Sequence, residues 1–372
     1  LQGSNKTGKK NKNCKSGGKT HIFHGVMMSV LAISQVYVWG IAAGILAIII
    51  LYILSQLESK KKADNDSKMD YLYSPENKKN HPQINSIFDS TGNPANDFEL
   101  DKKANKGRLS DYLISSSYNS CCSGDFLDSY VSLDALKNVI NQGARVLDFS
   151  IYLINEGGKP TAVVGAAPDS STNIKGTYNH LNLGDVFKMI NEKAMTSGSC
   201  TNWNDPLFIH LRIMSTKSEQ LYKSLAGQFN DIWPDDSSSP IFVNSDNKQL
   251  GDIPLSSIKG KIVVMITDRN ANNDTSADDA LAKSNVKKFL NRVSSFYDYK
   301  NFDTCGHMVK INKTNAHATD IENIKKQTRK KIYIIVPDEL AVNDNMHYQT
   351  HHNMGCQMVC MNWQNLDGPL EA

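Results

Sequence analysis

A run of nineteen uncharged and almost entirely apolar residues, VYVWGIAAGILAIIILYIL at Val36–Leu54, constrains this chain most strongly. As a helix it would be about 28 Å long, close to the hydrocarbon thickness of a bilayer. Tyr37, Trp39 and Tyr52 lie near its ends, where aromatic side chains favour the membrane interface. The run is longer than the apolar core of a secretory signal peptide, and charged residues follow it. It therefore predicts a membrane anchor.

The anchor divides the 372-residue sequence into four predicted parts. A basic tail at 1–25 precedes a transmembrane helix at 26–57, whose core is 36–54. An irregular polar linker at 58–105 leads to a folded domain at 106–372. Six lysines precede the span and three follow it closely, so the positive-inside tendency weakly favours a cytosolic N-terminus for a single-pass protein.

Within the span, Gly40 and Gly44 form a GxxxG pattern. Small residues four positions apart let two membrane helices approach closely. The pattern is common in membrane helices, so self-association through these glycines is one reading and simple lipid exposure is the other.

Composition excludes some classes of function. The net charge is +3 and the basic residues are clustered in the tail, so nucleic acid is not an expected partner. Seven cysteines lack the paired CxxC spacing of a structural zinc site, and neither a metal nor another cofactor is predicted. Cysteine usage does not indicate the compartment.

From Leu109 onward, short β-rich apolar runs alternate with amphipathic stretches, which predicts an α/β fold. The predicted strands are Leu109–Ser115, Ala144–Ile154, Thr161–Val164, Leu207–Ile213, Lys261–Thr267, Cys305–Val309, Ile332–Val336 and Gln357–Asn362. The predicted helices are Leu133–Gln142, Leu183–Ala194, Lys217–Phe229, Ala277–Phe296 and Ala318–Lys330. Eight strands over this length favour a (β/α)8 barrel, although no helix is apparent between the second and third strands.

Four stretches, in the same order, resemble the catalytic barrel of phosphoinositide-specific phospholipase C. LSDYLISSSYNS at 109–120 is similar to the family's LSxYxISSSHNTY, and NVINQGARVLDFSIY at 138–152 is similar to its GCRCxELDCW strand. IKGKIVVMIT at 258–267 resembles LKGKILVKGK. NMGCQMVCMNWQNLDGPL at 353–370 resembles the closing NxGCQMVALNFQTxD and is the most specific match. The resemblance implies a TIM barrel of the phospholipase C-like phosphodiesterase family.

The resemblance also implies a pair of catalytic histidines and a phosphate grip, and this sequence departs from both. The first histidine corresponds to Tyr118, whose phenol has an ordinary pKa near 10 and is a poor base at neutral pH. The second corresponds to Val164, which has no proton chemistry. The two phosphate-binding lysines correspond to Met265 and Thr267. Each position has lost the group that the chemistry requires.

The family's calcium ligands correspond to Asn119, Asp148, Ser150 and Arg212. A hard dication needs several oxygen ligands and does not tolerate a cation among them. Arg212 would place positive charge where the metal belongs. We therefore predict that Asp148 and Arg212 form an ion pair across a former metal site.

Other histidines offer alternative chemistry. His210 lies two residues before Arg212 on a predicted strand, so the two should share a face, and His180 is a second candidate. His347 and His351 have i,i+4 spacing with His352 beside them. That spacing suits a metal, but in a polar segment solvated histidines are more common.

These features favour a catalytically inactive, membrane-anchored pseudoenzyme that serves as a structural or scaffolding component. Its predicted partners are the lipid bilayer and other proteins of an ordered assembly, with no small-molecule substrate. Frequent Asn and Lys, which suit an AT-rich genome, together with the basic tail and single anchor, suggest a minor capsid or membrane-linking virion protein of a large DNA virus. The alternatives are a divergent phosphodiesterase with relocated catalytic residues and a module that binds phosphoinositide headgroups.

Overall fold

The structure is a computed structural model with two compact units, Leu1–Lys60 and Lys61–Ala372, which are described separately. The residues that it describes are 18–74, 76–77, 84–88, 107–168, 175–215, 219–244, 248–268, 289, 292–295, 297–298, 308–312, 321–338 and 343–371.

The first unit consists of the N-terminal part of helix α1 (Gly18–Leu72). Within Gln35–Leu72 an apolar window reaches a mean hydropathy of 2.5, and its side chains are exposed, so this helix is long and apolar enough to cross a membrane. Residues 18–25, predicted as part of the basic tail, are helical, and residues 1–17 lie outside the described part. An added Cβ at Gly40 or Gly44 would meet no atom within 4 Å, and self-association there stays a prediction.

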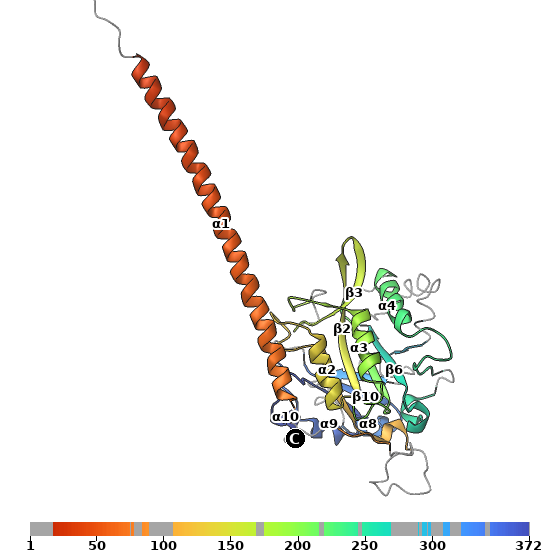
Figure 1. Ribbon diagram of the computed structural model, residues 1–372. Coiled ribbons are helices and arrows are strands. Elements are labelled where there is room, and N and C mark those ends of the chain that lie inside the picture. The colour runs from red at the N-terminus through yellow and green to blue at the C-terminus, as the bar shows by residue number, and fades with distance from the viewer. Residues whose placement is uncertain are drawn as a thin grey trace, which may run out of the picture. The chain divides into compact units, whose positions relative to one another are not determined.

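The second unit is built on one sheet with the strand order β7-β6-β5-β2-β1-β11-β10-β9-β8, in which all neighbours are parallel. β7 (Ser294–Ser295) and β8 (Tyr297–Asp298) stand at the two ends of this order but are one residue apart in the chain, so the order closes on itself. This order confirms the predicted eight-position barrel, and Figure 1 shows three of its strands, β2, β6 and β10. Its other strands are β1 (Ile114–Ser117), β2 (Val146–Glu156), β5 (Leu207–Ile213), β6 (Ile262–Asp268), β9 (Met308–Asn312), β10 (Ile332–Val336) and β11 (Met358–Met361).

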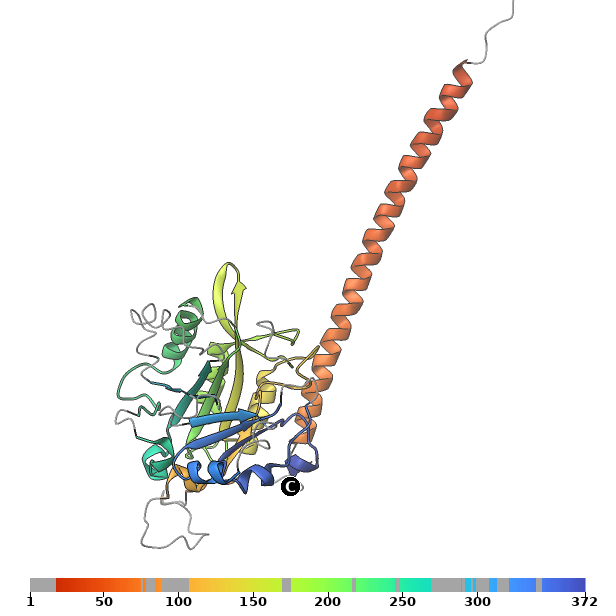
Figure 2. The same cartoon turned by 180° about the vertical axis from the view of Figure 1, so that it is seen from behind.

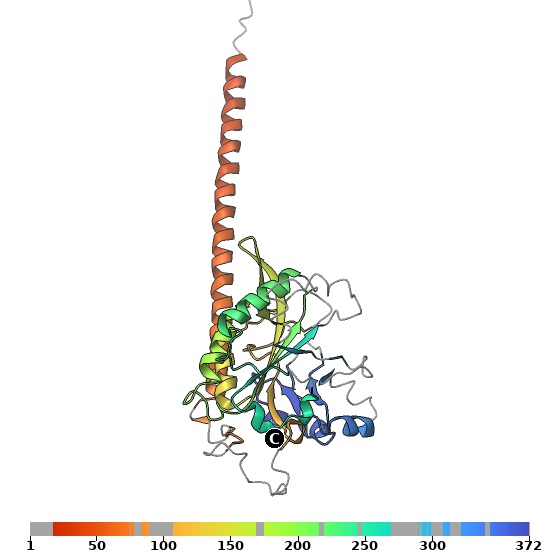
Figure 3. The same ribbon diagram turned by 90° about the vertical axis from the view of Figure 1, so that its right-hand side faces the viewer.

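Helices cover the barrel from outside, and α2, α3 and α4 pack side by side. Figure 3 shows α3 and α4 on one side of the strands and the blue C-terminal elements on the other. Figure 2, which is the view of Figure 1 turned by 180°, brings the blue C-terminal strands to the front. The helices of this unit are α2 (Leu133–Gln142), α3 (Leu183–Lys193), α4 (Glu219–Ile232), α8 (Ile321–Gln327), α9 (Tyr348–His352) and α10 (Gly368–Glu371), and the 3-10 turns are η2 (Leu109–Asp111), η3 (Leu250–Asp252) and η4 (Leu255–Ile258).

Local sequence signals account for α2, whose bounds match the prediction. The Ser132 side chain accepts a hydrogen bond from the backbone N–H of Asp134 at 3.1 Å and caps the N-terminus. Gly143, with φ of 105°, ends the helix in the left-handed conformation that glycine adopts without strain. α2 therefore begins and ends where its capping residues require.

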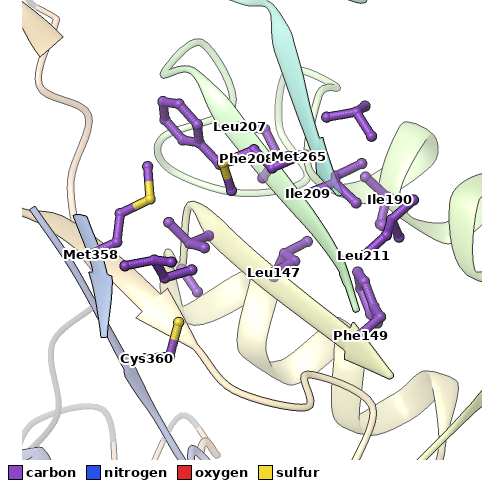
Figure 4. Packing of buried hydrophobic residues seen from close by; sticks show 14 of the residues in the cluster. Leu147, Phe149, Ile190, Leu207, Phe208, Ile209, Leu211, Met265, Met358 and Cys360 are labelled. Atoms are coloured by element: carbon purple, nitrogen blue, oxygen red, sulfur yellow. The ribbon is translucent and has the colours of Figure 1, made fainter. Parts of the chain in front are cut away.

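The core lies between the barrel and its helices. In Figure 4, Phe149 of β2 and Leu211 of β5 lie beside Ile190 of α3, and all three side chains are fully buried. Because side chains alternate along a strand, this contact identifies the outer face of β2 and β5. Asp148 is next to Phe149 in the chain, and His210 and Arg212 are on either side of Leu211. These three side chains therefore face the barrel interior.

Three assignments from the sequence were wrong. Thr161–Val164 was counted as a barrel strand, but it belongs to β3 (Lys159–Gly165), which pairs antiparallel with β2 in a hairpin and also with β4 (Leu181–Asn182). A hairpin needs no crossover helix, which explains why none was found. The eighth barrel position is instead occupied by β7 (Ser294–Ser295) and β8 (Tyr297–Asp298), of which β7 falls within the predicted helix Ala277–Phe296. Leu109, predicted to begin a strand, opens the 3-10 turn η2.

The predicted irregular linker at 58–105 is largely wrong where the structure describes it. Residues 58–72 continue α1, and residues 61–72 belong to the folded unit. Met69 is 1% exposed, and the Tyr73 hydroxyl donates to the carbonyl of Trp363 at 2.5 Å. A second piece, 84–88, is held by Asp205, which accepts from the Ser86 hydroxyl at 2.5 Å. Buried Met69 offsets the cost of ordering this polar segment.

Candidate functional site

Strand register gathers the polar side chains of the barrel interior into two rows across β2, β5 and β6. In parallel neighbours, residues in register point to the same side. The first row holds Asp148, His210 and Met265, and the second holds Ser150, Arg212 and Thr267. Six of the predicted site positions thus meet Asn119 and Tyr118, which follow β1, at one end of the barrel interior.

An ion pair between Asp148 and Arg212 forms the centre of this site. The Arg212 Nε donates to Asp148 Oδ1 at 3.1 Å and to Oδ2 at 2.9 Å, and its Nη2 donates to Oδ1 at 2.8 Å. Asp148 is fully buried and Arg212 is 5% exposed. The predicted ion pair is confirmed, with the fork geometry in which arginine binds carboxylates most strongly.

Asn119 also binds the guanidinium, and Ser150 holds Asn119 in place. The Asn119 Oδ1 accepts from Arg212 Nη2 at 2.6 Å and from the Ser150 hydroxyl at 2.8 Å. The backbone N–H of Asn119 donates to Asp148 Oδ1 at 3.0 Å. Asn119 has a φ of 43°, a left-handed conformation that asparagine tolerates better than most residues. This backbone turn aims both its amide oxygen and its N–H at the ion pair.

His210 bridges the two rows. Its Nδ1 lies 2.7 Å from Asp148 Oδ2, and its Nε2 lies 2.8 Å from the Thr267 hydroxyl. An ionised carboxylate only accepts hydrogen bonds, so Nδ1 carries the proton and Nε2 accepts from Thr267 in the neutral ring. The sequence predicted that His210 and Arg212 share a face, but it gave no signal for the bridge to Thr267.

The Tyr118 ring covers the guanidinium. The Arg212 Cζ lies 4.4 Å from the Tyr118 ring centroid, and Tyr118 packs edge-on against Phe126 with centroids 5.6 Å apart. A guanidinium over an aromatic face is stabilised by the ring quadrupole. The residues at the predicted base position and at one predicted metal position are therefore in direct contact, so these two substitutions suit each other physically.

Burial and charge act in opposite directions on both ionised groups. Burial by itself raises the pKa of Asp148, but the charge of Arg212 and the hydrogen bond from His210 outweigh it, so the pKa lies below its usual value. Burial by itself lowers the pKa of Arg212, and the Asp148 carboxylate reverses that effect. Both groups are therefore ionised at neutral pH, and the pair carries no net charge.

These donors do not fit the calcium ion that the resemblance implies. Calcium takes six to eight oxygen ligands. Both oxygens of Asp148 already accept hydrogen bonds from Arg212, and the Asn119 oxygen accepts two more. Arg212 fills the centre of the ligand set with positive charge. In the described part of the chain, no group of three or more His, Cys, Asp or Glu side chains is placed to hold a metal ion.

Residues 106–267 match the family model described as phosphatidylinositol-specific phospholipase C, X domain. The folded unit has a phospholipase C-like α/β fold. Among solved structures, PLC21 of S. officinalis superposes with a TM-score of 0.52 at 18% identity, over 71% of this chain and 35% of its own length. PLC21 of L. pealei gives 0.52 at 17% identity over the same shares. The chain thus spans about a third of the length of these two proteins.

A calcium-dependent phosphoinositol-specific phospholipase C from a Pseudomonas species has 13% identity and a TM-score of 0.45, covering 73% of this chain and 96% of its own. A search of curated protein sequences found no match. At 17–18% identity, the two PLC21 structures show the fold of the folded unit and nothing finer.

Two predicted site positions of the folded unit take no part in the polar network. Val164 pairs with Ile151, so it lies on the other face of β2 from Asp148 and Ser150, and it is 1% exposed in the hydrophobic core. Met265 lies in the same row as His210 and is fully buried. Both side chains contribute packing instead of polar contacts.

Among the histidines whose side chains the structure describes, those outside the ion-pair network do not form a second site. His351 is buried, and His352 packs edge-on against Tyr348 with centroids 5.1 Å apart. His347 immediately precedes α9 and is exposed. The His180 Nε2 lies 3.9 Å from Glu156 Oε1 near the exposed end of the β2–β3 hairpin. A residue that the sequence did not indicate, Ser120, accepts from the backbone N–H of Asp148 at 3.0 Å.

Acid should weaken the phospholipase C-like domain through Asp148. Its pKa is lower in the folded state than the value of about 3.9 in an unfolded chain. The resulting stability is fully present above that value and is lost as pH falls below it. We expect the free energy of unfolding of the wild type to fall below pH 4 more steeply than that of Asp148→Asn, by up to about 1.4 kcal/mol per pH unit. Urea unfolding of both proteins between pH 7 and pH 3 measures the difference, and parallel pH profiles would contradict it.

Proposed function

We propose that this chain is a membrane-anchored, catalytically inactive member of the phospholipase C-like fold, and that its barrel serves as a rigid structural module. The observation that carries the proposal is the Arg212 guanidinium, which lies in a buried ion pair with Asp148 at the position where the family's metal would bind. A calcium ion would have to displace a cation that is already paired.

Proton transfer is also unsupported at the predicted positions. Tyr118 stacks on Arg212, and Val164 has no titratable group. His210 is the histidine of the ion-pair network, but it is fully buried and both of its ring nitrogens contact protein groups. A general base must come within hydrogen-bonding distance of the proton that it removes. His210 cannot do so without breaking its contacts to Asp148 or Thr267.

A scaffolding role follows from what these residues do instead. A buried network of hydrogen-bonded polar side chains links β2, β5, β6 and the turn after β1, in place of a metal. The barrel thereby keeps its shape, and the apolar helix supplies attachment to a bilayer. The predicted role in a virion, as a minor capsid or membrane-linking protein, stays a prediction drawn from composition.

A phosphodiesterase assay tests the proposal directly. The full chain is reconstituted into liposomes that contain phosphatidylinositol, and release of inositol phosphate is measured with calcium present. Because the base, the acid and the metal position are all replaced, we expect release no faster than from the Tyr118→Phe, His210→Ala double variant. An active phospholipase C in the same liposomes serves as the positive control. Calcium-dependent turnover above that of the double variant would overturn the proposal.

Thermal unfolding of the same preparation separates the alternatives. A ligand at one hundred times its dissociation constant stabilises the folded state by about 2.7 kcal/mol. We expect no shift of the unfolding midpoint with calcium or with inositol trisphosphate. A shift with inositol trisphosphate but without turnover would support the headgroup-binding module. A shift with calcium would show that Arg212 does not exclude the metal.

A further inference from the structure

Five basic side chains follow one another closely at the end of α8. They lie within seven consecutive positions, and we call them the basic patch: Lys325, Lys326, Arg329, Lys330 and Lys331. The first four are exposed, and Lys331 is half-buried. Lys325 and Lys326 lie in the last turn of α8, where cations stabilise a helix. Arg329 and Lys330 lie beyond the helix, so this structural role does not account for them.

The basic patch lies at the end of the barrel where the strands begin. It precedes β10 in the chain, as η2 precedes β1 and η3 and η4 precede β6. In a parallel barrel these connections reach the same end, whereas the ion pair lies beside Asn119, which follows β1 at the other end. Figure 1 shows α8 at the end of the folded unit opposite the β2–β3 hairpin. A partner on the basic patch therefore does not need access to the ion pair.

The backbone that carries the basic patch is fixed by its neighbours. The Gln357 Nε2 donates to the Thr328 carbonyl at 2.7 Å. Gly251 of η3 packs so closely that an added Cβ would overlap the Lys330 carbonyl. The barrel thus holds the backbone on both sides of Arg329, while the side chains of Arg329 and Lys330 are exposed. A fixed backbone reduces the conformational entropy that is lost when a partner binds.

The carboxylates around the basic patch already have cationic partners. Glu322 pairs with Lys325 at 3.3 Å. Asp252, which follows Gly251, and Asp111 both pair with Arg108, at 3.4 Å and 3.0 Å. In the part of the chain that the structure describes, no carboxylate forms an ion pair with the other three exposed members of the patch, Lys326, Arg329 and Lys330. Three neighbouring cations are therefore left without a counter-charge.

The extent and chemistry of the basic patch fit a short acidic peptide. Residues 325–331 span about 25 Å at most, whereas a protein that binds duplex DNA through phosphates makes roughly six to ten contacts. Single-stranded nucleic acid stacks on aromatic side chains, and residues 321–331 contain none. Arg329 can bind a carboxylate with two parallel hydrogen bonds. Ile321, one turn before Lys325 on α8, is 43% exposed and offers an apolar contact beside the charges.

We propose that the basic patch binds an acidic segment of another protein, whose carboxylates pair with Lys326, Arg329 and Lys330 and whose apolar side chain packs on Ile321. This inference deepens the scaffolding role of the proposed function and rests on it. Charge complementarity at an exposed surface contributes mainly to orientation and to the rate of association. Binding of a short segment should therefore weaken as salt screens the charges.

Fluorescence anisotropy of a labelled octaglutamate peptide tests the inference with the full chain in a non-ionic detergent at low salt. The six lysines of the tail are replaced by glutamine in every sample, because they would bind the peptide as well. This change lowers the formal net charge from +3 to −3, so the peptide can bind only to a local basic surface. In this background, the triple substitution Lys326→Gln, Arg329→Gln, Lys330→Gln should weaken binding at least about tenfold. Octaglutamine should not bind.

The matched control removes three other exposed lysines from α2, the β2–β3 hairpin and α3, by the substitutions Lys137→Gln, Lys159→Gln and Lys188→Gln. Both triple variants lower the net charge by three, so only the position of the lost charges differs. We expect the control to bind the peptide within about twofold of the background, because these lysines lie outside the patch. In the background chain, the peptide should also protect Lys326 and Lys330 from acetylation and leave Lys137 and Lys188 reactive.

The other outcomes also decide the question. Equal loss of affinity in both triple variants would mean that the peptide responds only to net charge, and would overturn the inference. Tighter binding of a short DNA duplex or of phosphatidylserine vesicles than of octaglutamate, lost in the patch variant, would show a different class of partner and would overturn it too. Release of inositol phosphate is a separate measurement. Turnover would contradict the proposed inactivity and leave the patch, whereas absent peptide binding without turnover would contradict only the patch.

Discussion

Replacing Arg212 with leucine should lower the free energy of unfolding by about 3–5 kcal/mol, because it leaves the Asp148 carboxylate buried without a counter-charge. Asp148 is fully buried and receives three hydrogen bonds from the Arg212 side chain. Urea unfolding of the full chain in detergent, followed by tryptophan fluorescence, measures the loss. Arg212→Lys should recover part of it, since an ammonium restores charge but cannot reproduce the fork.

Arg108 offers a matched control. Arg108 forms ion pairs too, with Asp111 at 3.0 Å and with Asp252 at 3.4 Å, but its side chain is 44% exposed. Arg108→Leu should therefore cost at most about 1 kcal/mol. The double variant Arg212→Leu, Asp148→Leu should lose less than the sum of its single variants, because it leaves no unpaired charge. A cost for Arg212→Leu no larger than for Arg108→Leu would mean that the ion pair does not hold the barrel together.

The sequence predicted those parts of the barrel whose pattern is local. β5, β10 and α2 have the predicted bounds, because a continuous apolar run or a capped amphipathic stretch defines each of them. β3 was misplaced for a different reason. Its β-rich residues predict a strand correctly, but strand propensity does not encode the direction of pairing, and only the register with β2 shows the hairpin.

The polar site was predictable to the extent that the resemblance located its residues. The resemblance assigned Asp148 and Arg212 to the same former metal site. Opposite charges that are buried together in a barrel are expected to form an ion pair. The Tyr118 contact and the His210 bridge were not predictable, because they depend on turn geometry after β1 and on the exact register of β5 with β6. Single-residue shifts in either would separate these groups.

The segment 61–72 was misread because its composition is that of a linker. Lysines and acidic residues dominate it, and only Met69 and Leu72 offer apolar surface to the barrel. Residues 61–72 contain neither proline nor glycine, the two residues that most disfavour a helix. The helix of the apolar span can therefore continue into the folded unit. The packing of a few side chains then decides between tether and domain, and sequence periodicity gives no measure of that packing.

Replacing Met69 with alanine should therefore lower the free energy of unfolding of the folded unit by about 2–5 kcal/mol, as for other buried methionines. Met69 is 1% exposed and belongs to the main core cluster. Met69→Leu should cost less than about 1.5 kcal/mol, because it conserves volume.

Tyr71, two residues away on the same helix and 65% exposed, provides the control, and Tyr71→Ala should change stability by no more than about 0.5 kcal/mol. Equal small effects at both positions, measured by urea unfolding of the full chain, would mean that residues 61–72 act as a tether. A large effect at Met69 alone would mean that residues 61–72 are part of the core of the folded unit. In that case, loss of one buried side chain would loosen this stretch of α1 from the core as well as weaken the unit.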